Sequence, residues 1–140
     1  MMASLRQEPI PAAARTPPAI LVVEDEVLVR MMIAQELRIA GFAVIEAASP
    51  DEAMEVLANR DDIAVVFTDL RMRGPNDGID FARRLRAQSR AVKIIFSSGH
   101  LSAVDSIAHD GFFPKPCNVP RLIEHIRTML AWERVGPPDR

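Results

Sequence analysis

Short apolar runs alternate with amphipathic segments along most of this chain. The runs are continuous and several are rich in β-branched residues, as in strands that are buried on both faces of a sheet. They predict strands over residues 19–23, 42–46, 63–68, 92–97 and 112–114. Helical patterns between and after these strands predict helices over 27–40, 50–59, 79–87 and from 119 onward. Ser102 and Asp105 stand at capping-box spacing and predict a short helix over 102–108. Five strands that alternate with five helices predict an α/β fold with a parallel sheet and helices on both faces.

Two helix boundaries carry strong sequence signals. Gly41 follows the helix predicted over 27–40, in the place where glycine commonly ends a helix. Ser49, Pro50 and Glu52 combine an N-cap serine, a proline at the first helical position and the glutamate of a capping box. These residues predict that the second helix begins at Pro50.

The two ends of the chain lack this patterning. Residues 1–17 are rich in proline and alanine and have no apolar segment of the kind found in a secretory signal. Residues 133–140 contain two prolines and a glycine. We therefore expect a flexible N-terminal tail over 1–17, one domain over 18–132 and a C-terminal tail over 133–140. No run approaches the ~20 apolar residues of a membrane span, which argues against a membrane protein.

Charge and cysteine content narrow the function further. The net charge of −2 gives no indication of a surface that binds nucleic acid directly. We interpret the basic residues Arg83, Arg84 and Arg86 as the solvated face of a helix. Cys117 is the only cysteine, so an internal disulfide and a cysteine-rich metal site are excluded. A reducing, cytoplasmic location is expected.

Polar residues stand at the ends of the predicted strands. Glu24 and Asp25 follow the first strand, Asp69 follows the third, Ser98 ends the fourth and Lys115 follows the fifth. Right-handed crossovers bring these strand ends to one edge of the sheet, where ligands bind in such folds. Clustered carboxylates need a cation to offset their repulsion, and oxygen ligands suit Mg²⁺ or Mn²⁺. A carboxylate can also attack phosphorus, and phosphoryl transfer depends on alignment and charge neutralisation.

Four motifs in this order carry a family resemblance: LVVEDE (21–26), FTDLRM (67–72), IIFSSGH (94–100) and FFPKP (112–116). The chain resembles the receiver domain of bacterial two-component response regulators over about residues 18–132. The resemblance implies the flavodoxin-like receiver fold, a doubly wound five-stranded parallel sheet with five helices. It also implies phosphorylation of Asp69, and metal binding by Asp25, by Glu24 directly or through water, by Asp69 and by the backbone carbonyl of Arg71.

The resemblance assigns further roles at the same site. Ser98, rather than Ser97, matches the residue whose hydroxyl contacts the phosphoryl group, and Lys115 matches the lysine of the family. Ser98 and Phe112 match the switch residues that respond to phosphorylation, and the peptide before Pro116 is often cis. In this chain the segment between Ser98 and Lys115 is short, which predicts that the fourth helix is shortened by more than one turn.

The resemblance implies a receiver that takes a phosphoryl group from a sensor histidine kinase or a histidine phosphotransfer protein, and the length of one domain leads us to expect a stand-alone receiver. Its output would be a conformational change read by an unknown downstream protein, or removal of phosphoryl groups from a relay. Such a protein is no enzyme beyond its own phosphorylation and dephosphorylation. His100 is expected to line the entrance of the site.

Three other functions need to be compared with this one. A receiver-like binding module that does not depend on phosphorylation is the main alternative, because the shortened fourth helix alters a signalling surface. A metal-dependent phosphatase with an aspartyl nucleophile is disfavoured, since such enzymes generally need an acid two residues after the nucleophile and this chain has Arg71 there. A nucleotide-binding fold is disfavoured because VVEDE (22–26) stands where a glycine-rich phosphate loop would be.

Overall fold

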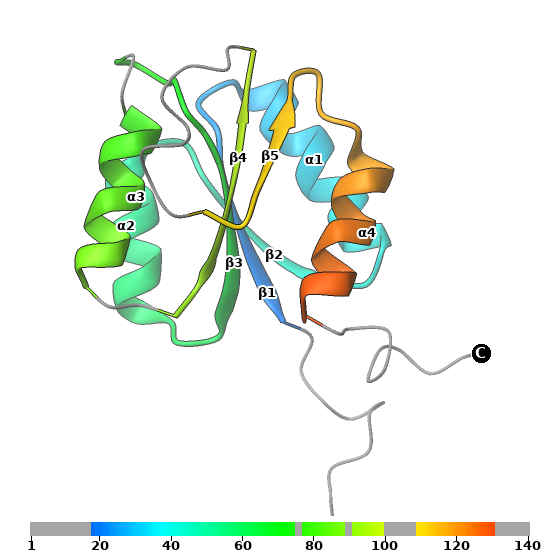
Figure 1. Ribbon diagram of the computed structural model, residues 1–140, viewed down its shortest axis with the longest axis horizontal. Helices are drawn as coiled ribbons and strands as arrows, with labels where there is room; N and C mark the ends of the chain where they lie inside the picture. Colours follow the sequence, from blue (N-terminus) through cyan, green and yellow to red (C-terminus); the bar gives the residue numbers. More distant parts are fainter. Residues whose placement is uncertain (1–17, 75–76, 89–90, 100–108, 131–140) are drawn as a thin grey trace, which may run out of the picture.

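A five-stranded parallel sheet lies between two pairs of helices in the computed structural model, which describes residues 18–74, 77–88, 91–99 and 109–130 (Figure 1). The strand order is β2–β1–β3–β4–β5, and every neighbouring pair is parallel. The strands are β1 (Ala19–Val23), β2 (Ala43–Ala47), β3 (Ile63–Asp69), β4 (Lys93–Ser98) and β5 (Gly111–Pro114). The helices are α1 (Val27–Ile39), α2 (Pro50–Asn59), α3 (Asp77–Ala87) and α4 (Val119–Leu130).

This architecture confirms the predicted doubly wound parallel fold. Four helices are present in the described residues; the short helix predicted over 102–108 lies outside them, as do the predicted tails. All observed boundaries fall within two residues of the predicted ones. The largest difference is at α3, which begins at Asp77 because the Asp77 side chain accepts the Gly74 amide at 2.8 Å and closes the preceding turn. Strand β3 extends to Asp69, so this residue is part of the sheet and does not lie in the loop that follows it.

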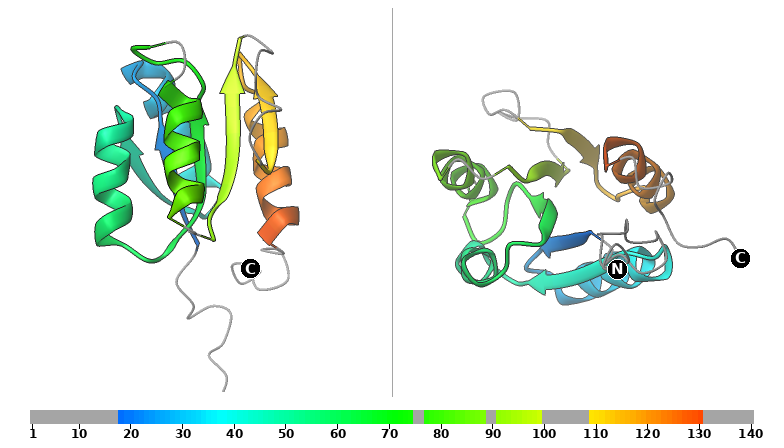
Figure 2. Two further views of the ribbon diagram at one scale, coloured as in Figure 1. Left: turned by 60° about the vertical axis from the view of Figure 1, so that its left-hand side comes forward. Right: turned by 90° about the horizontal axis from the view of Figure 1, so that it is seen from below.

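Side chains of each strand alternate between two apolar layers. Figure 2 shows α2 and α3 on one face of the sheet and α1 and α4 on the other. The first layer includes Leu21, Val66, Ile94 and Phe96 of the sheet with Phe81 and Leu85 of α3. The second includes Val22, Phe67 and Ile95 with Ile33 and Leu37 of α1 and Leu122 and Ile126 of α4. Burial on both faces of β1, β3 and β4 explains why these strands read as continuous apolar runs. None of the helices described is long and apolar enough to cross a bilayer.

The predicted helix signals at Gly41 and Ser49 are confirmed. Gly41 has a φ of 105° after the end of α1, a conformation that glycine adopts without steric cost. Ser49 Oγ accepts the amide of Glu52 at 3.1 Å. The Glu52 carboxylate in turn accepts the amide of Ala48 at 2.7 Å, one residue before the usual position. Both ends of the β2 region are thus fixed by local hydrogen bonds and backbone geometry.

Replacing Ser49 with alanine should lower the free energy of unfolding by about 1 kcal/mol, because the substitution removes the N-cap acceptor of α2. Urea denaturation would measure the change. Thr128→Ala, at an exposed position on α4, is a control that should stay within about 0.5 kcal/mol of the wild type. Equal stabilities of the two variants would contradict the capping role.

Candidate functional site

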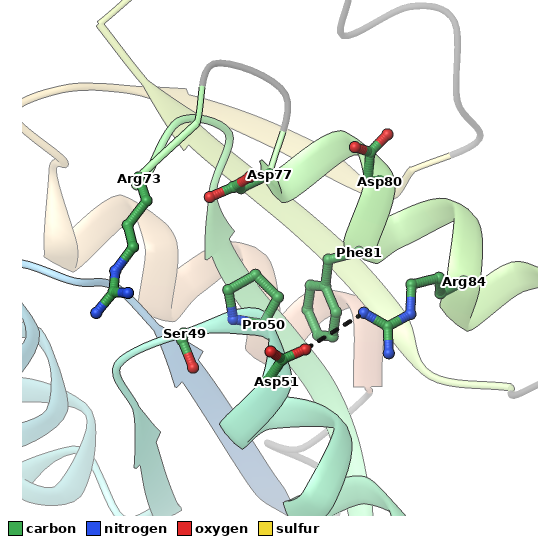
Figure 3. A pocket seen from close by; sticks show the side chains of 8 residues that line it. All are labelled: Ser49, Pro50, Asp51, Arg73, Asp77, Asp80, Phe81 and Arg84. Carbon is green, nitrogen blue, oxygen red and sulfur yellow. Dashed lines mark ion pairs between the residues drawn. The ribbon is translucent and has the colours of Figure 1, made fainter.

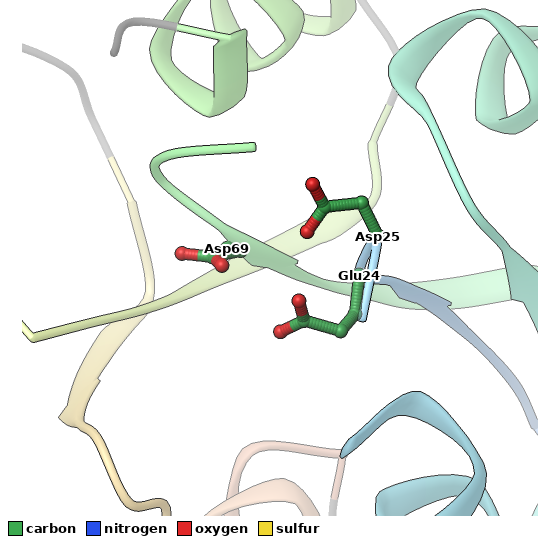
Figure 4. A group of neighbouring side chains, drawn as sticks. All are labelled: Glu24, Asp25 and Asp69. Carbon is green, nitrogen blue, oxygen red and sulfur yellow. The ribbon is translucent and has the colours of Figure 1, made fainter. Parts of the chain in front are cut away.

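Three carboxylates gather at the carboxyl edge of the sheet. Glu24 and Asp25 follow β1 and Asp69 ends β3, and one ligand oxygen from each lies within 4.8 Å of the others. Figure 4 shows the three side chains extending into the same space. Glu24 and Asp69 are only 4% and 6% exposed, whereas Asp25 is more open to solvent. The fold therefore brings together three carboxylates from the ends of two strands, as the sequence predicted.

Lys115 connects two of these carboxylates. Its ammonium group, just beyond β5, donates to Asp69 Oδ2 at 2.7 Å and to Glu24 Oε1 at 3.0 Å. Partial burial opposes the charge of Lys115, but the hydrogen bonds to Asp69 and Glu24 outweigh it and raise its pKa above the ordinary value. Lys115 therefore stays cationic over the whole physiological range and offsets part of the negative charge at the site.

Backbone amides hold the second oxygen of each buried carboxylate. The amide of Arg71 donates to Asp69 Oδ1 at 3.2 Å, and the amide of Glu26 donates to Glu24 Oε2 at 3.0 Å. Both oxygens of Glu24 and of Asp69 consequently have a donor. Because each carboxylate is fixed at two points, its orientation is set before any ligand arrives.

Arg30 supports the site from α1, a role that the sequence analysis missed. Its guanidinium donates to the backbone oxygen of Glu24 at 2.8 Å and to Glu46 Oε1 at 3.3 Å. Its side chain is only 15% exposed. Arg30 thus ties the segment that carries Glu24 both to its own helix and to the end of β2. In the sequence, only the position of Arg30 one helical turn after Glu26 indicated that its side chain could reach the site.

The remaining predicted residues surround this cluster. Ser98 is the last residue of β4, is buried, and accepts the Lys115 amide through its backbone oxygen at 3.0 Å. Phe112 is half-buried in β5 and packs against the α2–α3 layer. The Lys115–Pro116 peptide is cis, as the family resemblance implied. Roles of Ser98 and Phe112 in contacting a phosphoryl group or switching conformation stay predictions, and His100 lies outside the described residues.

The donor set fits a hard divalent cation. Three carboxylates lie close together and two of them are buried, which is costly unless cations balance the charge. Lys115 supplies one positive charge, so negative charge remains in excess at this point. Mg²⁺ prefers oxygen ligands, typically uses one or two carboxylates and keeps several waters. Asp25, Asp69 and Glu24 are therefore suited to Mg²⁺ or Mn²⁺, and the Arg71 carbonyl stays a predicted further ligand.

The buried Glu24 makes stability depend on pH when no divalent metal is present. Burial raises the pKa of Glu24 above 4.5, and the hydrogen bonds from the Glu26 amide and Lys115 oppose this only in part. The folded protein therefore binds this proton more tightly than the unfolded chain does. The resulting stabilisation is present below pH 4.5 and is lost as the pH rises through the elevated pKa.

We therefore expect Glu24→Gln to stabilise the metal-free protein relative to the wild type near pH 7 and to lose this advantage near pH 4. Urea denaturation at several pH values, with a chelator present, measures the difference. Glu55→Gln on the exposed face of α2 controls for the loss of one negative charge. A stability difference between wild type and Glu24→Gln that does not change with pH would contradict the assignment.

A hollow lies between the first turns of α2 and α3, on the face of the sheet that these two helices cover (Figure 3). Charged side chains from both helices line it, and Arg84 pairs with Asp51 at 3.7 Å. Arg83 pairs with Asp80 at the same distance, and all four side chains are at least half exposed. Mutually paired, solvated charges are a surface feature of modest energy. The interpretation of Arg83 and Arg84 as a solvated helix face is therefore confirmed.

Arg86 departs from that interpretation. Its guanidinium turns toward the sheet and donates to the Val92 carbonyl at 2.9 Å and to Asp110 Oδ2 at 3.2 Å. Asp110 Oδ2 also accepts the Ile94 amide at 2.8 Å, and the Asp110 carbonyl lies 2.7 Å from His125 Nε2. Asp110 thereby joins α3, β4 and α4 immediately before β5. The partners of Arg86 lie too far along the chain for helical periodicity to reveal them.

Comparison with known proteins identifies the family. The family model of the response regulator receiver domain matches residues 20–127. This chain belongs to the response regulator receiver domain family. The receiver resemblance drawn from the four motifs is thus confirmed.

Curated receiver relatives are larger proteins. The chain is 35% identical to SphR of Synechococcus elongatus, named as an alkaline phosphatase synthesis transcriptional regulatory protein, over 93% of this chain. It is 33% identical to the aerobic respiration control protein ArcA of Escherichia coli over 81% of this chain. It is 35% identical to the sensor kinase CckA of Brucella abortus over 79% of this chain. The chain spans 55%, 49% and 12% of these relatives, so their activities as whole proteins do not carry over directly.

Solved receiver structures cover nearly the same region. A response regulator receiver protein from Pseudomonas putida is 30% identical with a TM-score of 0.75, over 82% of this chain and 99% of that one. The receiver domain of the hybrid histidine kinase CckA is 33% identical with a TM-score of 0.67, over 80% and 98%. TrrA of Thermotoga maritima, solved in complex with Mg²⁺-BeF, is 26% identical with a TM-score of 0.70, over 79% and 97%.

Proposed function

We propose that this receiver domain accepts a phosphoryl group on Asp69 from a histidine kinase or a histidine phosphotransfer protein, in a reaction that requires Mg²⁺ or Mn²⁺. The contact of Lys115 with Asp69 Oδ2 at 2.7 Å and with Glu24 Oε1 at 3.0 Å carries this proposal. It places a cation directly beside a buried carboxylate that has acidic neighbours. An acceptor carboxylate and a charge-neutralising group are thus already together.

The transfer is a nucleophilic displacement at phosphorus. A carboxylate oxygen of Asp69 forms a bond to phosphorus while the P–N bond of the donor phosphohistidine breaks, and the imidazole nitrogen retains the electron pair. The Lys115 ammonium neutralises a phosphoryl oxygen, and the Ser98 hydroxyl donates to another. A divalent metal held by Asp25, Asp69, Glu24 and the Arg71 carbonyl would neutralise further negative charge on the phosphoryl group. The amide of Arg71 keeps Asp69 oriented throughout.

TrrA, a response regulator of similar fold, was solved in complex with Mg²⁺-BeF, which supports a metal-dependent reaction in a protein of this family. We extend it to this chain because the carboxylates present here fit the same ion class. Hydrolysis of the acyl phosphate would complete the cycle, so the chain would act catalytically only on its own phosphoryl group. A stand-alone arrangement of the receiver stays a prediction.

Exposed apolar side chains on α1 support a protein as the phosphoryl donor. Val27 and Leu28 stand at the start of the helix, just after Glu24 and Asp25, and are 54% and 79% exposed. Met31 and Met32, one turn further, are 52% and 50% exposed. Exposed apolar patches of this kind mark interaction sites. A downstream protein would read the change in Ser98 and Phe112 after phosphorylation.

Metal dependence provides the direct test. The chain is incubated with acetyl phosphate, with Mg²⁺ or with a chelator, and intact mass is measured over time. We expect a gain of one phosphoryl group with Mg²⁺ and essentially none with the chelator, since three carboxylates without a metal repel the incoming anion. A histidine phosphotransfer protein as donor should give the same dependence. If neither donor labels the protein in Mg²⁺, the phosphorylation-independent binding module becomes the better description.

A further inference from the structure

A cavity of about 300 Å³ lies beside the carboxylates, on the α1–α4 side of the sheet. This volume is at the small end of the range for ligand pockets, enough for one ring with a short substituent. One end is polar and the other apolar. The lining consists of Glu24, Glu26, Val29, Met32, Ile33, Phe67, Asp69, Ser97, Lys115, Pro116 and Cys117.

The Ser97 hydroxyl is a polar group in the wall of this cavity that is available for a hydrogen bond to a ligand. It is the register partner of Asp69 on the neighbouring strand, and its side chain is on the same face of the sheet. The residue is 3% exposed, and its hydroxyl has no hydrogen-bond partner within the described parts of the chain. Buried hydroxyls in folded proteins are almost always paired, because an unpaired one costs free energy. A ligand that reaches Ser97 Oγ would recover this cost.

The rest of the cavity wall is apolar and uncharged. Phe67 and Ile33 are buried beneath it, Val29 is half-buried, and Met32 stands at 50% exposure on the solvent side. Cys117 completes the wall, and burial raises the pKa of its thiol to about 11, so it is neutral at physiological pH. A flat aromatic or compact alkyl group would bury its surface against these side chains.

The charge at the polar end of the cavity determines which polar group of a ligand would bind there. Three carboxylates, those of Glu24, Glu26 and Asp69, line the cavity together with one ammonium group, that of Lys115. Negative charge is in excess, so a cation is attracted and an anion is repelled. Ser97 Oγ can accept a hydrogen bond from a cationic nitrogen as readily as from a neutral one.

We propose that this cavity is a binding site for a small amphipathic cation, an aromatic or alkyl group with an amidinium or ammonium head. The head lies between Ser97 and the carboxylates, and the apolar part packs against Phe67, Ile33 and Val29. This ligand plays no part in phosphoryl acceptance itself, but its site shares Glu24, Asp69 and Lys115 with the phosphoryl-acceptance site.

Benzamidine is a suitable probe, with its neutral analogue benzamide as the matched ligand. Titrations on the full chain are followed by methyl NMR of ¹³C-labelled methionine, in which Met32 reports on the mouth of the cavity. All samples contain a chelator, so the outcome does not depend on phosphorylation or on a metal. A second readout is the rate at which a thiol reagent modifies Cys117, the only cysteine of the chain.

We expect saturable binding of benzamidine, at least about tenfold tighter than benzamide, with slower modification of Cys117. Ser97→Ala should weaken benzamidine about five- to tenfold, the effect of one hydrogen bond. Val29→Phe should abolish binding by filling the cavity, whereas Thr128→Ala on the far part of α4 should bind as the wild type does.

Three results would overturn the proposal. The first is the absence of saturable change at Met32 and of protection at Cys117 in the wild-type protein, a measurement that needs no variant to fold. The second is equal affinity for benzamidine and benzamide, which would remove the cationic selectivity. The third is wild-type affinity in both Ser97→Ala and Val29→Phe, which would place the ligand elsewhere.

Discussion

Asp69→Asn should lower phosphoryl transfer to this protein by at least about a thousandfold, as expected when a nucleophile is lost. The amide of asparagine has the shape of the carboxylate but neither its charge nor its nucleophilicity. Lys115 keeps its contact with Glu24, so the surrounding site stays in place. Intact mass after incubation with acetyl phosphate and Mg²⁺ measures the effect.

Asp69 is also a predicted metal ligand, so this experiment needs a variant that separates the two roles. Asp25→Asn removes a ligand but leaves the acceptor, and high Mg²⁺ should therefore restore part of its labelling. No concentration of Mg²⁺ should restore Asp69→Asn. Asp80→Asn, whose side chain is 65% exposed on α3, should label like the wild type. Labelling of Asp69→Asn at the wild-type rate would show that another residue is the acceptor.

Gly78→Ala should have the largest effect on stability, about 3 kcal/mol, at the upper end for an overpacked site. A Cβ atom at this position would collide with the backbone oxygen of Asp69 and lie 2.6 Å from the Cα atom of Leu70. Both atoms belong to the backbone and cannot rotate away. The start of α3 must then move away from β3, which would break the bond from the Gly78 amide to the Leu70 carbonyl, now 2.9 Å long.

The same movement would displace Asp69, so phosphoryl transfer should fall by about a hundredfold even in molecules that remain folded. Urea denaturation and intact mass measure the two effects separately. Gly99→Ala is the matched stability control, because no atom of the described residues lies within 4 Å of a Cβ atom there, and it should stay within about 0.5 kcal/mol of the wild type. A Gly78→Ala protein as stable as Gly99→Ala would show that α3 and β3 can separate at little cost.

The strands and the carboxylate cluster could be predicted because both depend on features that short segments of sequence contain. An apolar run of five or six residues identifies a buried strand, and parallel topology then places every strand end at one edge. Glu24, Asp25, Asp69 and Lys115 could therefore be grouped without knowledge of any distance. The roles of Ser98 and Phe112 rest on the family resemblance and await measurement.

Other features could not be read from the sequence for a physical reason. In β4 both Ile95 and Phe96 are buried, one in each apolar layer, so no alternation of polar and apolar residues shows which serine faces Asp69. Ser97 is the register partner of Asp69, whereas the family resemblance points to Ser98 as the phosphoryl contact. The pairing of Arg86 with Asp110 joins residues 24 positions apart, and only the folded chain brings them together.

Asp110 makes the position of Lys115 independent of the length of the segment that precedes β5. It anchors the start of β5 through Ile94, Arg86 and His125, while the Lys115 amide fixes the end of the strand to Ser98. The position of Lys115 is thus set by contacts on both sides of a four-residue strand. A change in the number of residues between Gly99 and His109 would therefore leave the lysine in place, and with it the contacts of Lys115 to Asp69 and Glu24.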